Sequence, residues 1–157
     1  MKKVEIEARA AELFDQGYYC AESVLLSVAE AAGKSEGLSL EIATGFCSGM
    51  SRTAGPCGAV TGAVMALGLV SGRSDADQSV ERNDQRTRGM GARFGERFGS
   101  GNCSELLGCD LGTAEGQARF RDQRLGERCR EYTITAAALA GEIAALAQPD
   151  SGKKDPS

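Results

Sequence analysis

Apolar residues recur at every third or fourth position along most of this chain, and no stretch of useful length alternates with a period of two. The first spacing lines one face of a helix, whereas a half-buried strand needs alternation. The segment 18–32 shows the helical spacing well, and Gly33 is a suitable residue to end it. The sequence therefore predicts an all-α protein, a single-domain bundle of about five to seven helices over residues 1–148. A polar tail over residues 149–157 is expected to be disordered.

Capping residues and glycines give the limits of the individual helices. The stretch 45–56 follows no period, is rich in Gly and Ser, and ends in Pro56, which suits the first turn of a new helix. It is therefore predicted to be a loop, and the nearly apolar helix that follows it is predicted to be central. The predicted helices cover residues 2–16, 18–32, 39–44, 57–70, 76–98, 103–107, 113–125 and 126–147.

Composition excludes several classes of function. The net charge is −4, and with no Trp and 5% aromatic residues the chain lacks the basic surface and the stacking platforms of nucleic-acid binders. It has no histidine, which excludes Cys–His catalytic pairs, mixed Cys/His zinc sites and a histidine-ligated haem. The first residues are acidic where a signal peptide is apolar, and the apolar run 59–70 is shorter than the roughly 20 residues that span a bilayer. A cytoplasmic protein without a membrane partner is expected.

Six cysteines stand out in such a chain, and no two of them form a Cys-x-x-Cys pair. In a reducing compartment this number indicates catalysis or metal binding rather than a disulfide framework, although free cysteines are also ordinary buried residues. Four of them fall at predicted helix N-termini, where free backbone N–H groups and the helix dipole favour a thiolate. These four are Cys20, Cys57, Cys103 and Cys129; Cys47 lies in the Gly-rich loop and Cys109 shortly after Cys103.

Two glycines follow Cys57 on the predicted central helix. Gly58 and Gly62 are four residues apart, so they share one face of that helix. A small-residue face favours close helix packing, which is the simpler interpretation. The functional interpretation is that Gly58 keeps the surroundings of Cys57 open for a partner sulfur, an ion or a substrate. Gly58 and Gly62 are the candidate cofactor-binding residues. The loop that contains Arg52 is a weaker candidate for binding an anion ahead of the helix, because it matches no known phosphate-binding motif.

The hexapeptide Cys57-Gly58-Ala59-Val60-Thr61-Gly62 resembles the CGAxxG signature of the C_GCAxxG_C_C family of redox-active proteins. The contexts Gly17-Tyr18-Tyr19-Cys20 and Gly101-Asn102-Cys103-Ser104 are similar to the family pattern too, and the resemblance extends from about residue 17 to residue 146. It implies that the cysteines of the family are Cys20, Cys57, Cys103 and Cys129. Cys47 stands where the pattern is expected to have glycine, and Cys109 is additional to it.

Two redox mechanisms follow. In the first, Cys57 is the attacking thiolate of a dithiol–disulfide exchange, with a pKa below the roughly 8.5 of a free thiol. The flexible loop would bring Cys47 back to Cys57 as a resolving thiol. In the second, Cys20, Cys57, Cys103 and Cys129 hold a metal ion or an iron–sulfur cluster. Both imply a redox partner protein, and the sequence leaves a homodimer open. The alternative is a non-catalytic helical interaction protein with reduced, buried cysteines.

Overall fold

The structure is a computed structural model that describes residues 3–145. Within this range the chain forms eight α-helices and one 3₁₀ helix, so the prediction of an all-α fold is confirmed. The number exceeds the expected five to seven, and the one helix outside the predicted ranges lies in the predicted loop 45–56. The helices are α1 (Lys3–Asp15), α2 (Cys20–Ala31), η1 (Leu40–Phe46), α3 (Cys47–Arg52), α4 (Gly58–Ser71), α5 (Glu81–Phe98), α6 (Cys103–Leu107), α7 (Ala114–Asp122) and α8 (Gly126–Ala145).

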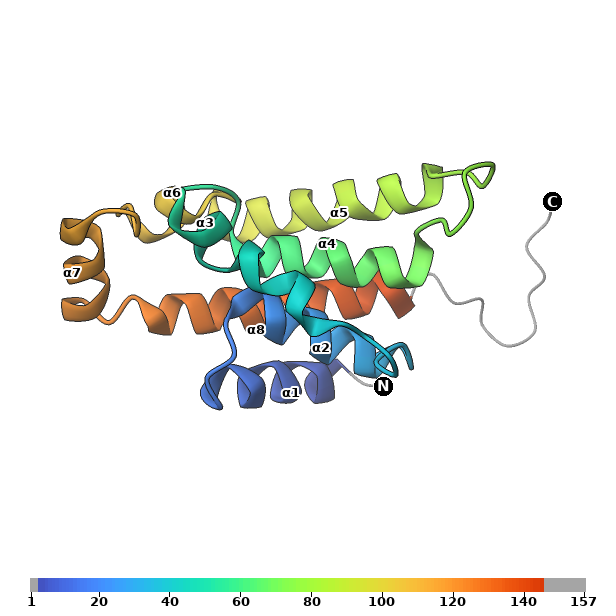
Figure 1. Cartoon of the computed structure of the whole chain (residues 1–157), viewed down its shortest axis with the longest axis horizontal. Helices are drawn as coiled ribbons and strands as arrows, with labels where there is room; N and C mark the ends of the chain where they lie inside the picture. The colour runs from blue at the N-terminus through green and yellow to red at the C-terminus, as the bar shows by residue number, and fades with distance from the viewer. Residues whose placement is uncertain (1–2, 146–157) are drawn as a thin grey trace.

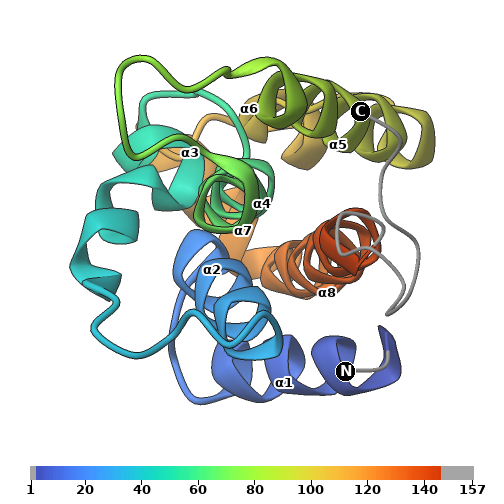
Figure 2. The same cartoon turned by 90° about the vertical axis from the view of Figure 1, so that its right-hand side faces the viewer.

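Helix α8 is the centre of the bundle and packs against α1, α2, α4 and α5 (Figures 1 and 2). Its buried face is rich in alanine, which lets neighbouring helices approach closely. Helix α4 packs most extensively against α2, where Gly62 leaves room for the backbone of Ala21. Larger side chains fill the remaining space, among them Leu13, Leu67 and Phe94, which are fully buried. The core therefore combines close helix contacts with a few large apolar side chains.

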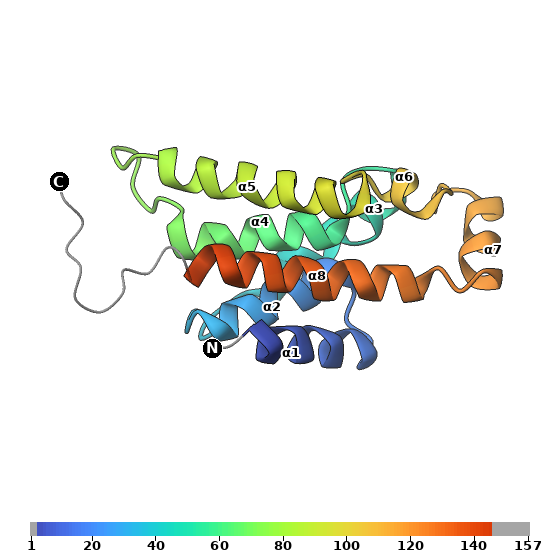
Figure 3. The same cartoon turned by 180° about the vertical axis from the view of Figure 1, so that it is seen from behind.

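The short helices gather at one end of the bundle. Figures 1 and 3 show α3 and α6 side by side beyond the N-terminal end of α4, with α7 projecting farther out. The Tyr132 hydroxyl in α8 donates a hydrogen bond to the Leu106 carbonyl in α6 (3.1 Å). Its ring packs edge-on against Phe98, with 4.8 Å between the ring centroids. These contacts fix the small helices to the long ones at the end where most of the cysteines lie.

Several predicted boundaries differ from the structure, and the largest difference is at the start of α5. Helix α5 begins at Glu81 rather than at residue 76, because the Gln78 side chain accepts hydrogen bonds from the backbone N–H groups of Ser74 and Asp75 and stabilises a turn instead. The predicted loop 45–56 contains a helical turn, α3. The predicted tail, residues 149–157, lies outside the described residues. None of the described helices has the length and apolar character needed to cross a membrane.

Candidate functional site

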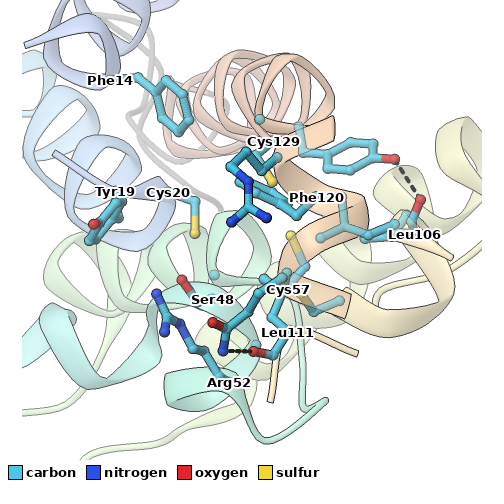
Figure 4. A pocket seen from close by; sticks show the side chains of 18 residues that line it. Phe14, Tyr19, Cys20, Ser48, Arg52, Cys57, Leu106, Leu111, Phe120 and Cys129 are labelled. Carbon is cyan, nitrogen blue, oxygen red and sulfur yellow. Dashed lines mark hydrogen bonds between the residues drawn. The ribbon is translucent and has the colours of Figure 1, made fainter. Parts of the chain in front are cut away.

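A cavity of about 490 Å³ lies at the end of the bundle where the short helices gather (Figure 4). Its lining is mostly apolar, which is typical of small-molecule sites. All four cysteines at predicted helix N-termini contribute to its wall. The complete lining is Phe14, Tyr19, Cys20, Ser48, Gly49, Arg52, Cys57, Gly58, Cys103, Leu106, Leu107, Leu111, Gln117, Phe120, Arg121, Gly126, Cys129 and Tyr132.

Each of these four cysteines begins or nearly begins a helix. Cys20 is the first residue of α2, Cys103 is the first residue of α6, and Cys57 is the N-cap of α4. Cys129 lies in the first turn of α8. The N-terminal placement inferred from the sequence is therefore correct for all four. The structure adds that the four helices point these ends at the same cavity (Figure 4).

A short backbone pairing brings two of the cysteines together. Pro56 and Asn102 form an isolated antiparallel bridge. On either side of it, the Cys57 N–H donates to the Gly101 carbonyl (2.7 Å) and the Cys103 N–H donates to the Gly55 carbonyl (3.0 Å). In such a pairing, Cys57 and Cys103 occupy diagonal positions on the same face. Their approach to within disulfide reach, with Cα atoms about 7 Å apart or less, remains a prediction.

Helix α3 is a left-handed turn, and it covers Cys103. Ser48, Gly49, Met50 and Ser51 have φ between 56° and 65° and ψ between 41° and 60°. Residues other than glycine lose roughly 1–2 kcal/mol each in this conformation. A Cβ added at Gly49 would lie 2.6 Å from the Cys103 Cβ and 3.1 Å from its sulfur. Glycine suits residue 49 for two reasons, because the backbone there is left-handed and because Cys103 leaves no room for a side chain.

Cys47, which begins this turn, lies near Cys20. Its sulfur is 3.6 Å from the Ala43 carbonyl oxygen, and a Cβ added at Gly58 would meet both the Cys20 sulfur and the Cys47 Cα. The interaction with Cys20 is the largest cause that raises the pKa of Cys47, followed by burial, and the backbone N–H groups of Ala21 and Glu22 oppose that shift. The Cys47 thiol thus keeps its proton. The pairing of Cys47 with Cys57 as a resolving thiol stays a prediction.

A carboxylate lies next to this thiol pair. The Cys47 sulfur is 3.9 Å from Oε1 of Glu22. Glu22 is held by two further hydrogen bonds, from the Tyr19 backbone N–H to Oε1 (3.0 Å) and from the Thr44 hydroxyl to Oε2 (3.0 Å). The first belongs to the capping box of α2. Glu22 is thus positioned to accept a proton from Cys47.

The two glycines that follow Cys57 have different surroundings. A Cβ added at Gly58 would overlap the Cys20 sulfur and would lie 3.2 Å from Cys47 Cα. Gly58 lines the cavity and leaves room for the Cys20 sulfur. At Gly62 a Cβ would meet the Ala21 carbonyl oxygen at 2.6 Å. Gly62 is absent from the cavity wall, and its surroundings are those of the simpler interpretation, close packing of α2 and α4.

The pKa expected for Cys57 was wrong in direction. Burial raises the pKa of the Cys57 thiol to about 11, even though the backbone N–H groups of Ala59 and Val60 act to lower it. The helix N-terminus thus has the predicted effect, but desolvation outweighs it. Burial also raises the pKa of Cys103, and it raises the pKa of Cys129 to about 12 with help from the neighbouring thiols. At neutral pH these three thiols are protonated.

All six cysteines are free thiols. Cys109 is buried and lies outside the cavity wall, beside Cys103. A four-thiolate centre needs sulfurs that converge on one point, about 2.3 Å from a zinc ion for example. Within residues 3–145 no three Cys, Asp or Glu side chains are grouped closely enough to hold a metal ion. In this arrangement the described thiols do not form a metal-ligand set.

The sequence analysis did not anticipate the aromatic and cationic part of the wall. Phe14 comes from α1, Phe120 and Arg121 from α7, and Tyr132 from α8. Arg52 had been noted only as part of a weak anion-binding loop. No local pattern marks these residues, because they meet only through the packing of helices distant in sequence. The sequence did predict α7, the helix that carries Phe120 and Arg121, from its capping residue Thr113. The Thr113 hydroxyl accepts a hydrogen bond from the Gly116 N–H (2.9 Å).

Comparison with known proteins gives one match. A family model described as "Putative redox-active protein (C_GCAxxG_C_C)" matches residues 18–143. This range begins just before Cys20 and ends within α8, so it contains every cysteine of the cavity. No curated protein and no solved structure matches the chain significantly.

Proposed function

Because the chain belongs to the C_GCAxxG_C_C family of redox-active proteins, we propose that it transfers electrons by dithiol–disulfide exchange at the wall of the cavity. The observation that carries the proposal is the proximity of two cysteines of unequal exposure. Cys20 is half-buried and lines the cavity, and Cys47 is buried. A Cβ added at Gly58 would overlap the Cys20 sulfur and would lie 3.2 Å from the Cys47 Cα, so the two cysteines are neighbours. An attacking thiol must be reachable, and a resolving thiol must be adjacent.

The reaction begins at Cys20. Its thiolate attacks one sulfur of a disulfide substrate, the substrate S–S bond breaks, and the first half leaves as a thiolate that takes a proton. This leaves a mixed disulfide on Cys20.

Cys47 then resolves the mixed disulfide. It gives its proton toward Glu22 and attacks the Cys20 sulfur, and the second half of the substrate leaves and is protonated. In the whole reaction two protein thiols are oxidised to one disulfide, and the substrate disulfide is reduced to two thiols. Cys57, Cys103 and Cys129 face the same cavity and form a second group of thiols to which the disulfide could pass.

Disulfide mapping tests the proposal. The reduced protein is mixed with a small disulfide in the absence of oxygen, and the products are identified by mass spectrometry. The expected product is a Cys20–Cys47 disulfide, whereas Cys47→Ser should stop at a mixed disulfide on Cys20. Cys109→Ser is the matched control, because Cys109 is a buried thiol outside the cavity wall. Thiols that react only after denaturation would instead favour the non-catalytic interaction protein.

A further inference from the structure

The charges in the cavity wall have one sign. Among the residues that line it, the charged ones are Arg52 and Arg121, and none is Asp or Glu. The chain as a whole carries a net charge of −4, so the charge of the cavity wall is opposite in sign to that of the protein. A guanidinium carries five N–H donors in a planar arrangement that matches a carboxylate. The wall is therefore suited to an anionic ligand.

Arg52 is free to bind such a ligand. It forms no ion pair and no side-chain hydrogen bond with any of residues 3–145, although seven ion pairs elsewhere in that range occupy other basic side chains. Figure 4 shows its guanidinium on the same side of the cavity as Ser48. Arg52 also continues the left-handed backbone of α3, with φ of 67°.

Hydrogen bonds within the turn maintain this unfavourable backbone. The Ser51 hydroxyl donates to the Gly45 carbonyl (2.9 Å), and the Thr53 hydroxyl donates to the Met50 carbonyl (2.8 Å). Strained backbone of this kind is concentrated at functional sites. In this protein the left-handed turn allows Gly49 and Arg52, which are three residues apart, both to line the cavity.

Arg121 reaches the cavity from α7. Among residues 3–145 it forms one ion pair, with the adjacent Asp122, at 3.6 Å and with both side chains more than 70% exposed. Such an exposed pair contributes little, so most of the donor capacity of Arg121 remains for a ligand. The α7 helix is held in place by the Arg119 side chain, which donates to the Gly108 carbonyl (3.0 Å). The two arginines therefore extend from separate, fixed elements.

Size and polarity limit the rest of the ligand. About 490 Å³ accommodates a small molecule rather than a folded partner. Phe14, Leu111 and Phe120 supply apolar surface, which suits a ring or a short hydrocarbon chain. The sulfur of Cys20 marks where such a molecule would react.

We propose that the substrate of the cavity is a small disulfide whose halves each carry a carboxylate on an apolar body, with Arg52 and Arg121 binding the carboxylates. This inference rests on the proposed thiol exchange and adds the class of substrate. The carboxylates position the substrate S–S bond near Cys20, and the electron balance is that of the exchange already described.

Two aromatic disulfides of similar size test the proposal, dithiobis(nitrobenzoate) with a carboxylate on each ring and dithiodipyridine without charge at neutral pH. Both release a coloured thiol, so a second-order rate constant is measured for each with the reduced protein. The quantity compared is the rate constant for the carboxylated disulfide divided by the rate constant for the neutral disulfide. Because one ratio is compared between variants, the intrinsic reactivity of each reagent cancels.

Arg52→Gln and Arg121→Gln are each expected to lower this ratio by roughly fivefold, the order of a partly solvated charge pair. Arg52→Lys keeps the positive charge and should keep most of the ratio. Arg88→Gln is the matched control, because Arg88 is exposed on α5 away from the cavity wall. The wild-type ratio should also fall as salt is added.

The outcomes separate this inference from the proposed function. If both disulfides oxidise Cys20 and the ratio is the same in Arg52→Gln, Arg121→Gln and wild type, the carboxylate site is refuted and the thiol exchange stands. If neither disulfide reacts with Cys20 in the folded protein, the thiol exchange itself is refuted.

Discussion

The sulfur of Cys20 lies so close to Gly58 that a Cβ on that glycine would overlap it. Cys20 begins α2 and Gly58 begins α4, so the contact lies where the two helix N-termini meet at the cavity. The same glycine leaves room for the backbone of Cys47. The thiol pair to which we assign the chemistry therefore depends on the absence of a side chain at residue 58.

Gly58→Ala should displace Cys20 and disturb the pair. We expect a loss of about 1–3 kcal/mol of unfolding free energy from the overlap, together with slower formation of the Cys20–Cys47 disulfide. Gly68→Ala is the matched control on the same helix, because a Cβ there meets nothing within 4 Å. It should raise the unfolding free energy by about 0.5–1 kcal/mol. Chemical denaturation and disulfide mapping measure the two effects, and equal behaviour of the two variants would contradict this role of Gly58.

Cys20 should alkylate faster than Cys57 in the reduced protein at neutral pH, by at least about tenfold. Cys20 is half-buried at the cavity wall, whereas Cys57 is buried and its pKa is raised to about 11. Peptide mapping after brief treatment with iodoacetamide gives the rate at each site, and the Cys57 rate should keep rising as the pH approaches 11. A Cys57 that reacts first would restore the mechanism in which it is the attacking thiolate.

The stability of the reduced protein should fall at alkaline pH. In the unfolded chain a thiol loses its proton near pH 8.5, whereas Cys57 in the folded protein keeps it until about pH 11. Between these values the unfolded state binds fewer protons, so the unfolding free energy decreases as pH rises, by roughly 2–3 kcal/mol for this residue. Below pH 8.5 its contribution is fully present. Urea denaturation between pH 8 and pH 11 measures the slope.

Cys57→Ser removes the titrating group and should flatten this decrease, even if it lowers stability overall. The remaining slope would come from Cys103 and Cys129, whose pKa values burial also raises. An unchanged slope in Cys57→Ser would mean that Cys57 is not protonated in the folded protein at alkaline pH.

The strain near α3 can be measured at Ala54, which is exposed and has φ of 58°. Ala54→Gly should raise the unfolding free energy by about 1 kcal/mol, because glycine adopts this backbone without the Cβ penalty. The matched control is Ala8→Gly at an exposed position of α1, where the same change should cost about 1 kcal/mol. The opposite signs distinguish backbone strain from a general effect of glycine, and two losses would contradict the left-handed conformation.

Capping residues and glycines in the sequence were enough to predict most of the helices. Helix α6 has the predicted limits of residues 103–107, because Gly108 takes the left-handed conformation that ends it. Thr113 and Gly33 likewise mark helix ends near their predicted positions. These signals act within one turn of the chain, so they can be found without knowledge of the tertiary contacts.

The candidate site was predictable only in part. The N-terminal positions of Cys20, Cys57 and Cys103 follow from local rules, but the raised pKa of Cys57 depends on burial by distant helices. The left-handed turn could not be predicted either, because Ser48 and Met50 favour the right-handed region on their own. The proximity of Cys47 to Cys20 could not be predicted either, because it depends on the packing of α2 and α4 around Gly58.

The bridge between Pro56 and Asn102 also affects the order in which the parts of the site can come together during synthesis and folding. It joins positions separated by 46 residues, so the entropy of closing that loop is lost before the pairing contributes any stability. Cys20 and Cys47 lie together on the N-terminal side of that loop. On a ribosome they emerge and can meet while Cys103 is still unsynthesised. A nascent chain thus carries both residues of the exchanging pair before it carries Cys103 and Cys129, so the complete cavity wall can form only after the pair has been made.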